Sequence, residues 1–120
     1  MKQTAFYFYE LSEQAQEKAL DNVFYLEHYL YCDQNILDIA NKLYSSIYGG
    51  EIDSVDWSIS STYTLLNCMY TLQGSDKVYS MPEPILDTLQ MVIDAYTDRR
   101  ILENKMQQND YMFTENGHVI

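Results

Sequence analysis

The longest amphipathic stretch of the sequence, from Glu10 to Tyr31, constrains the fold most strongly. Ser12 is expected to cap a helix there, and Glu13 suits the positive end of the helix dipole. At about 100° per residue, a stripe of apolar side chains lies on one face and predicts packing against a core. The stripe consists of Ala15, Ala19, Val23, Leu26 and Leu30, flanked by Leu20, Phe24 and Tyr31.

The opposite face of this helix carries acidic and aromatic side chains. Glu17, Asp21, Tyr25 and Tyr29 follow one another at intervals of four residues and therefore share a face. One interpretation is a solvated outer face, which most amphipathic helices have. The other is a recognition surface, because tyrosine combines apolar area with a hydrogen-bonding tip. The sequence alone leaves both open.

Charge is the strongest global property of the chain. Eighteen acidic residues against 7 Lys and Arg give a formal net charge of −11, and Lys42 is the only basic residue between Ala19 and Asp76. Such a field repels nucleic acid and anionic membranes and favours a basic partner. We therefore expect neither direct nucleic-acid binding nor membrane association.

The chain length and composition favour a single domain. The 120 residues with 47% hydrophobic composition suffice for one modest core, so residues 1–120 are expected to fold as one domain. Strands are expected at residues 4–9, 55–60 and 63–72, with a terminal hairpin that turns at Asn116-Gly117. The strands at residues 55–60 and 63–72 would form a hairpin with a turn near residues 60–62, or else one bent strand. Helices complete the pattern, in the order β-α-α-β-β-α-β-β. This order predicts an α+β fold, with about three helices packed on a mostly antiparallel sheet.

The second and third helices have recognisable ends. The second is expected to begin at a cap formed by Asp33 or Asn35 and to stop at Gly49-Gly50. The third is expected from Pro84 to about Met106. Its apolar positions place three acids on the opposite side, about 10 and 6 Å apart along the axis at 1.5 Å per residue. These acids, Asp87, Asp94 and Asp98, are either a solvated face or a row that imitates spaced phosphates.

Motifs of catalysis and cofactor binding are missing from the sequence, which has no glycine-rich phosphate loop, Cys-x-x-Cys or His-Glu-x-x-His. His28 and His118 lie in different elements. Cys32 would share a helix face with His28, but a thiol at a helix end without an oxyanion hole is better explained as a core residue. We therefore expect no catalytic residue, no cofactor and no metal. Cys32 and Cys68 are expected to be reduced and buried.

Two terminal segments carry a recognisable pattern. Glu10-Leu11-Ser12-Glu13, Ala15-Gln16 and Lys18-Ala19 form one, and Phe113 to Gly117 form the other. Together they resemble a family of small phage-borne proteins of largely unassigned function. The resemblance implies a protein made by a phage or prophage that works in the host bacterial cytoplasm. Small acidic phage proteins without an active site are often inhibitors of host defence, including anti-CRISPR and anti-restriction proteins.

The first functional hypothesis combines this resemblance with the charge. The protein would be a non-catalytic anti-CRISPR protein, an acidic DNA mimic that blocks DNA access to a basic host protein. CRISPR effectors and restriction enzymes are the partners considered, because such proteins grip nucleic acid through Lys and Arg. The expected contact residues are Glu17, Asp21, Tyr25, Asp87, Asp94 and Asp98.

A second hypothesis is an oligomeric phage structural or assembly accessory protein. In this case the tyrosines would form a self-complementary interface, for example in a homodimer, and the acids would keep the assembly soluble. A third hypothesis, an enzyme that uses Cys32 or a histidine, has the least support from the motifs.

Overall fold

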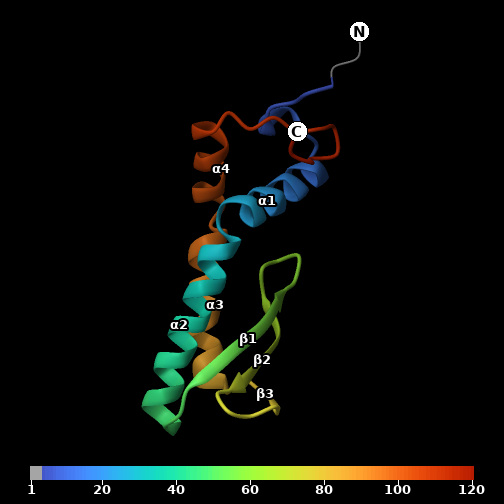
Figure 1. Ribbon diagram of the computed structural model, residues 1–120. Helices are drawn as coiled ribbons and strands as arrows, with labels where there is room; N and C mark the ends of the chain where they lie inside the picture. Colours follow the sequence, from blue (N-terminus) through green and yellow to red (C-terminus); the bar gives the residue numbers. More distant parts are fainter. Residues whose placement is uncertain (1–3) are drawn as a thin grey trace. The chain divides into compact units, whose positions relative to one another are not determined.

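The computed structural model describes residues 4–120 and has an α+β fold (Figure 1). The predicted fold class is confirmed, although the order of elements differs in detail. A three-residue 3-10 helix, η1, precedes four α-helices and a three-stranded antiparallel sheet of order β1-β2-β3. In chain order the elements are η1 Phe8–Glu10, α1 Glu13–Glu27, α2 Tyr29–Tyr48, β1 Ile52–Ile59, β2 Leu65–Leu72, β3 Val78–Ser80, α3 Glu83–Thr97 and α4 Arg99–Gln108.

The chain divides into two compact units. The terminal unit comprises residues 4–30 and 96–120, so it contains η1, α1, α4 and the C-terminal segment. The central unit comprises residues 31–95, with most of α2, the sheet and most of α3. The folding of residues 1–120 as one domain stays a prediction.

The core of the terminal unit forms around the first turns of α1. Ser12 caps the helix as predicted, because its Oγ accepts a hydrogen bond from the Ala15 amide at 3.2 Å. The buried face of α1 consists of Ala15, Ala19, Leu20, Val23 and Phe24. Leu102 and Met106 of α4 and Phe113 of the C-terminal segment are also buried in this unit.

The predicted helix from residue 10 to residue 31 is two helices. His28 leaves helical geometry at φ −124°, and α2 starts at Tyr29. Leu26 and Leu30, expected on the buried stripe, are 62% and 73% exposed, so that part of the prediction is wrong. Periodicity identifies the face of a helix that can be buried, but not how far along the axis other segments cover that face.

The strand predicted at residues 4–9 and the terminal hairpin are reduced to isolated bridges. Phe6 and Phe113 exchange two backbone hydrogen bonds of 2.9 and 2.8 Å, and Phe113 also bridges to Val119. After Phe6 the chain turns into η1, where the Tyr7 amide donates to the Glu10 side chain at 2.9 Å and Phe8 is buried. The predicted strands are therefore wrong. The turn at Asn116-Gly117 is confirmed, because the Gly117 amide donates to the Thr114 carbonyl oxygen at 2.9 Å.

In the central unit, α2 ends where it was predicted to end but does not begin where it was predicted to begin. It stops at Tyr48, and Gly49 follows with φ +67°, as predicted for a glycine stop. The expected cap at Asp33 or Asn35 is wrong, because both residues lie inside α2. Asp33 instead accepts a hydrogen bond of 2.7 Å from the indole nitrogen of Trp57, which joins α2 to β1.

The sheet contains the predicted hairpin and a strand that was not predicted. Trp57 is buried between the exposed Asp56 and Ser58, as alternation indicates. The chain turns back at residues 60–64, where the Ser60 amide donates a hydrogen bond of 2.9 Å to the Thr64 carbonyl oxygen. β3 follows a loop, and its three residues pair with residues 69–71 of β2. Three exposed residues have too short a pattern to identify as a strand; the free edge of β2 provides their partner.

The third predicted helix is interrupted at Asp98, which separates α3 from α4. Asp98 has ψ 123°, and its Oδ1 accepts a hydrogen bond of 2.8 Å from the Arg100 amide, so it is the N-cap of α4. Aspartate competes for amide hydrogens in this way and favours helix starts over helix interiors. The expected straight row of Asp87, Asp94 and Asp98 on one helix is therefore wrong.

Candidate protein-binding surface

The acidic face predicted for α1 is present in the terminal unit. Glu17 and Tyr25 are exposed and Asp21 is partly exposed, on the side away from the buried residues of the helix. Their spacing of four residues gives a row of two carboxylates followed by a ring. We call the surface formed by Glu17, Asp21 and Tyr25 of α1, together with Tyr29 at the start of α2, the α1 face.

Aromatic contacts fix the rings of the α1 face. The rings of Tyr25 and Tyr29 lie 5.3 Å apart, centroid to centroid. The buried Phe24 meets Tyr25 edge-on at 5.2 Å and Tyr29 at 6.3 Å. Tyr25 is nevertheless 53% exposed. A large exposed ring that is already held in place loses little conformational entropy when a partner covers it.

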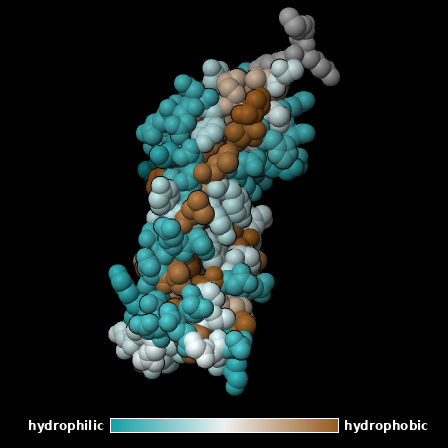
Figure 2. Space-filling model, viewed as in Figure 1, coloured by the Kyte–Doolittle hydropathy of each residue, from teal (hydrophilic) through white to brown (hydrophobic). Residues whose placement is uncertain are grey.

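Exposed leucines adjoin the α1 face in sequence. Leu26 and Leu30 follow Tyr25 and Tyr29 directly, and both are mostly exposed. Figure 2 shows some hydrophobic residues, in brown, at the surface among hydrophilic ones over the region where α1 lies in Figure 1. Grouped apolar side chains at a surface are typical of protein-binding sites.

The predicted acids of α3 form a separate group in the central unit. Asp87 and Asp94 are exposed. Asp94 also accepts a hydrogen bond of 2.9 Å from Gln90, whose amide oxygen receives the Leu65 amide of β2 at 2.7 Å. Asp94 therefore supports the docking of α3 on the sheet as well as adding charge. Asp98 belongs to the terminal unit, where it caps α4.

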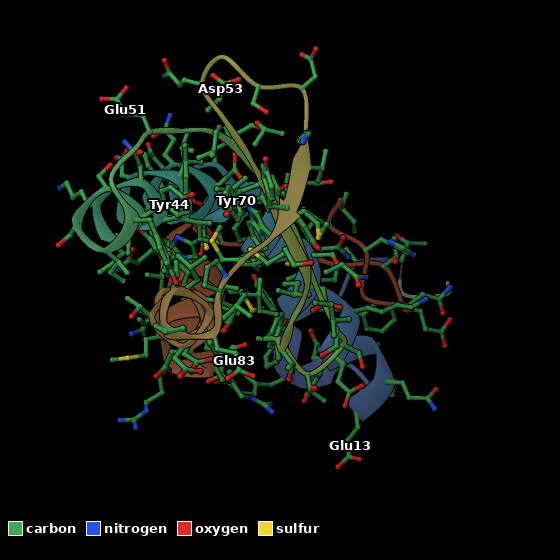
Figure 3. The ribbon with its side chains drawn as sticks, turned by 90° about the horizontal axis from the view of Figure 1, so that it is seen from below. Glu13, Tyr44, Glu51, Asp53, Tyr70 and Glu83 are labelled. Atoms are coloured by element: carbon green, nitrogen blue, oxygen red, sulfur yellow. The ribbon has the colours of Figure 1, made fainter. Side chains whose placement is uncertain are left out.

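A chain of four tyrosines in the central unit was not predicted. Tyr44 of α2 and Tyr70 of β2 point toward one another, with ring centroids 5.1 Å apart (Figure 3). Tyr48 lies 5.0 Å from Tyr44, and Tyr79 stacks at 5.4 Å on Tyr70. Burial, followed by a hydrogen bond with Tyr44, raises the pKa of Tyr70 to about 12. The cluster brings together residues that are distant in sequence, so no local pattern predicts it. The abundance of tyrosine in the chain was the only sequence feature that pointed to such a cluster.

Acidic residues lie beside this cluster. The Ser45 hydroxyl donates to the Gly50 carbonyl oxygen at 2.5 Å, so the turn before Glu51 is fastened to the end of α2 that bears Tyr44. Glu51 and Asp53 are exposed and point outward at the edge of the unit in Figure 3. In the central unit Lys42 and Lys77 are the only basic residues, so its surface is strongly acidic.

Burial shifts the pKa values of Cys32, Cys68 and His28. Burial raises the pKa of the Cys32 thiol to about 11, with a further contribution from Asp33, and the pKa of Cys68 to about 11, with a contribution from Asp56. Thiols with such pKa values are almost fully protonated at neutral pH and are weak nucleophiles. Burial, followed by the charge of Lys105, lowers the pKa of His28, and Glu27 offsets part of this effect.

Residues 4–120 contain no group of three or more His, Cys, Asp or Glu side chains placed to hold a metal ion. Among the helices of this described part, none is both long enough and apolar enough to cross a membrane.

Comparison with protein-family models, curated proteins and solved structures found no match for this chain.

Proposed function

We propose that the protein is a non-catalytic binding protein that places its α1 face against the basic surface of a nucleic-acid-binding protein and blocks access of nucleic acid. The observation that carries the proposal is the composition of this face. The exposed carboxylate of Glu17 and the partly exposed carboxylate of Asp21 lie on the same face as the fixed, half-exposed ring of Tyr25. Carboxylates meet the positive potential of a phosphate-binding groove, and the ring supplies contact area.

The net charge of −11 supports the same kind of partner. A negative field of this size accelerates encounter with a basic surface and repels the nucleic acid that competes for it. Asp87 and Asp94 would add to this field from α3. The resemblance of the two terminal segments to small phage-borne proteins extends the proposal: the target is a host defence enzyme, a CRISPR effector or a restriction enzyme, and the protein is an anti-CRISPR or anti-restriction inhibitor in the host cytoplasm.

A capture experiment with DNA competition tests the proposed function. The tagged protein is incubated with a lysate of bacteria that carry CRISPR and restriction systems, and bound proteins are identified by mass spectrometry. The proposal expects a nucleic-acid-binding enzyme that is displaced by double-stranded DNA and released as salt is raised, because exposed charge interactions are screened. Recovery that is unaffected by DNA and salt would contradict it.

The exposed leucines support a second candidate function, an oligomeric phage structural or assembly accessory protein. Leu26 and Leu30, with Tyr25 and Tyr29 beside them, could form a self-complementary patch across a twofold axis. Light scattering at increasing protein concentration tests this candidate. A mass that doubles for the wild type but not for Leu26→Ser/Leu30→Ser would favour it, and a constant monomer mass would exclude it.

A further inference from the structure

A cleft in the terminal unit lies between the η1 segment and one face of α4. It has a volume of about 240 Å³. Phe8 and Met106, both buried, lie at its base, while Tyr7 and Tyr9, 58% and 64% exposed, stand at its edge with Tyr111. The volume is below the roughly 300–1,000 Å³ of pockets for drug-sized ligands, so the cleft fits a single side chain better than a free metabolite.

Carboxylates complete the lining of this cleft. Glu103 projects from α4 on the same face as Met106, and Asp110 follows the end of the helix. Aromatic faces together with carboxylates attract organic cations, through the ring quadrupole and through charge. Among the residues 4–120 that the structure describes, those that line the cleft include no basic residue. Its chemistry therefore favours a cationic side chain.

One guanidinium group of the protein itself, that of Arg99, already lies against the lining of this cleft. The guanidinium carbon of Arg99 lies 5.7 Å from the centroid of the Phe8 ring, and Arg99 Nε donates to Glu103 Oε1 at 2.9 Å. The Tyr9 hydroxyl donates to the other oxygen, Oε2, at 3.3 Å. Both oxygens of Glu103 thus have donors, and the arrangement shows how a ring and a carboxylate here bind a planar cation.

Asp110 provides the carboxylate that remains available. Among the described residues 4–120, its side chain has no hydrogen bond or ion pair. The backbone of Asp110 has φ +51°, and the Tyr111 amide donates to the Met106 carbonyl oxygen at 3.0 Å, which closes the end of α4. Glycine is usual at this position because it has no Cβ. An aspartate here accepts backbone strain and places its carboxylate at the edge of the cleft.

We propose that this cleft binds an arginine side chain of a basic protein partner. The guanidinium group would lie against the tyrosine rings and form a charged pair with Asp110. Arginine suits the site better than lysine, because its planar group stacks on rings and its two-pronged donors match a carboxylate. The inference deepens the proposed function, since it relies on the same basic partner, but the cleft can be tested with the purified chain alone.

The test uses the peptide acetyl-Gly-Arg-Gly-amide and its citrulline counterpart, which has nearly the same shape but no charge. Tyrosine resonances of the isotopically labelled protein are followed by NMR during titration. We expect saturable shifts of Tyr7, Tyr9 and Tyr111, with millimolar affinity and about tenfold weaker binding of the citrulline peptide. Equal affinity for the two peptides, or no shift of these tyrosines, would overturn the proposal.

A matched pair of variants locates the interaction. Asp110→Asn and Glu115→Gln each remove one negative charge from the terminal unit, but Glu115 lies in the turn at residues 114–117 and does not line the cleft. We expect Asp110→Asn to weaken arginine-peptide binding about fivefold and Glu115→Gln to leave it unchanged. Equal weakening by both would mean that only net charge attracts the peptide, which contradicts a built site.

A third variant controls for folding. Asp110→Gly removes the carboxylate and relieves the positive φ, so it should unfold no more readily than the wild type and should bind the arginine peptide as poorly as Asp110→Asn. Undiminished binding by Asp110→Gly would overturn the role of the carboxylate. Arginine binding without capture of any DNA-displaced protein would refute the proposed function and leave the cleft intact, and the converse result would refute the cleft alone.

Discussion

Gly117 lies directly against the backbone of Ala15. A Cβ atom on Gly117 would stand 2.1 Å from the Ala15 carbonyl oxygen, and the Gly117 carbonyl oxygen accepts a hydrogen bond of 3.0 Å from the side chain of Asn22. The start of α1 and the C-terminal turn therefore pack on each other within the terminal unit.

Because of this contact, we predict that Gly117→Ala lowers the stability of the protein more than a glycine-to-alanine change usually does. The new methyl group would clash with backbone, and φ +91° is unfavourable for alanine. We expect a loss of about 3 kcal/mol or more in the free energy of unfolding. Gly74→Ala is the control, because Gly74 has φ +79° and no atom of the described residues lies within 4 Å of the added Cβ. It should lose only about 1 kcal/mol. Equal losses, measured by circular dichroism in denaturant, would show that Gly117 has no special contact.

His28 predicts a dependence of stability on mildly acidic pH. Its Nε2 is buried with no hydrogen-bond partner in the described part of the chain, residues 4–120, and burial lowers its pKa from 6.5. The unfolded chain therefore takes up a proton at a higher pH than the folded chain does, so stability is full above about pH 6.5 and falls as the pH is lowered below it.

Denaturant unfolding between pH 7 and pH 5.5 measures this effect. The fall in stability should disappear in His28→Gln and persist in His118→Gln, the control at the exposed histidine. A fall that is unchanged in His28→Gln would mean that other groups cause it.

The hydrogen bond between Trp57 and Asp33 holds α2 to the sheet, so its removal should lower stability. Asp33→Ala removes the acceptor of a 2.7 Å hydrogen bond from a tryptophan that is 9% exposed. We expect a loss of about 2 kcal/mol in the free energy of unfolding and a shift of the tryptophan emission. Asp33→Asn retains an acceptor oxygen and should lose less than half as much. Trp57 is the one tryptophan of the chain, so its fluorescence reports this unit directly. Identical stabilities of the two variants would argue against the bond.

The buried Tyr70 and the partly buried Tyr111 predict a loss of stability at high pH. Burial raises the pKa of Tyr111 to about 12, with a hydrogen bond to Glu27 as the second cause, and Tyr70 has a similar pKa. Both are raised above the ordinary 10. Their contribution to stability is therefore complete below pH 10 and is lost as the pH rises from 10 toward 12. In an absorbance titration, Tyr70→Phe and Tyr111→Phe should each remove one late-titrating group. A titration that ends near pH 10 in the wild type would contradict this assignment.

Local signals in the sequence predicted much of the fold. The Ser12 cap, the stop at Gly49 and the alternation around Trp57 each depend on neighbouring residues, and each is confirmed. The helix breaks at His28 and Asp98 were missed, because the apolar periodicity continues through both. β3 was missed because its pairing comes from the edge of β2 and not from its own residues.

The candidate surfaces show the same difference between features set by neighbouring residues and features set by distant ones. The spacing of Glu17, Asp21 and Tyr25 was enough to predict that they share one face of α1. The exposure of Leu26 depends on how far other segments cover the helix, which periodicity does not contain. The cleft joins residues about a hundred positions apart, such as Tyr9 and Glu103, whose contact arises only when the chain ends pack together.

The most direct test of the account compares two charge reversals in binding to the DNA-displaced protein recovered by capture. Glu17→Lys/Asp21→Lys changes the α1 face, and Asp87→Lys/Asp94→Lys makes the same change of net charge on α3. After thermal unfolding has confirmed that both variants fold, calorimetry at fixed salt gives the affinities. We predict at least about tenfold weaker binding for the α1 variant and a smaller loss for the α3 variant. Unchanged affinity of the α1 variant would contradict the proposal that the α1 face makes the contact.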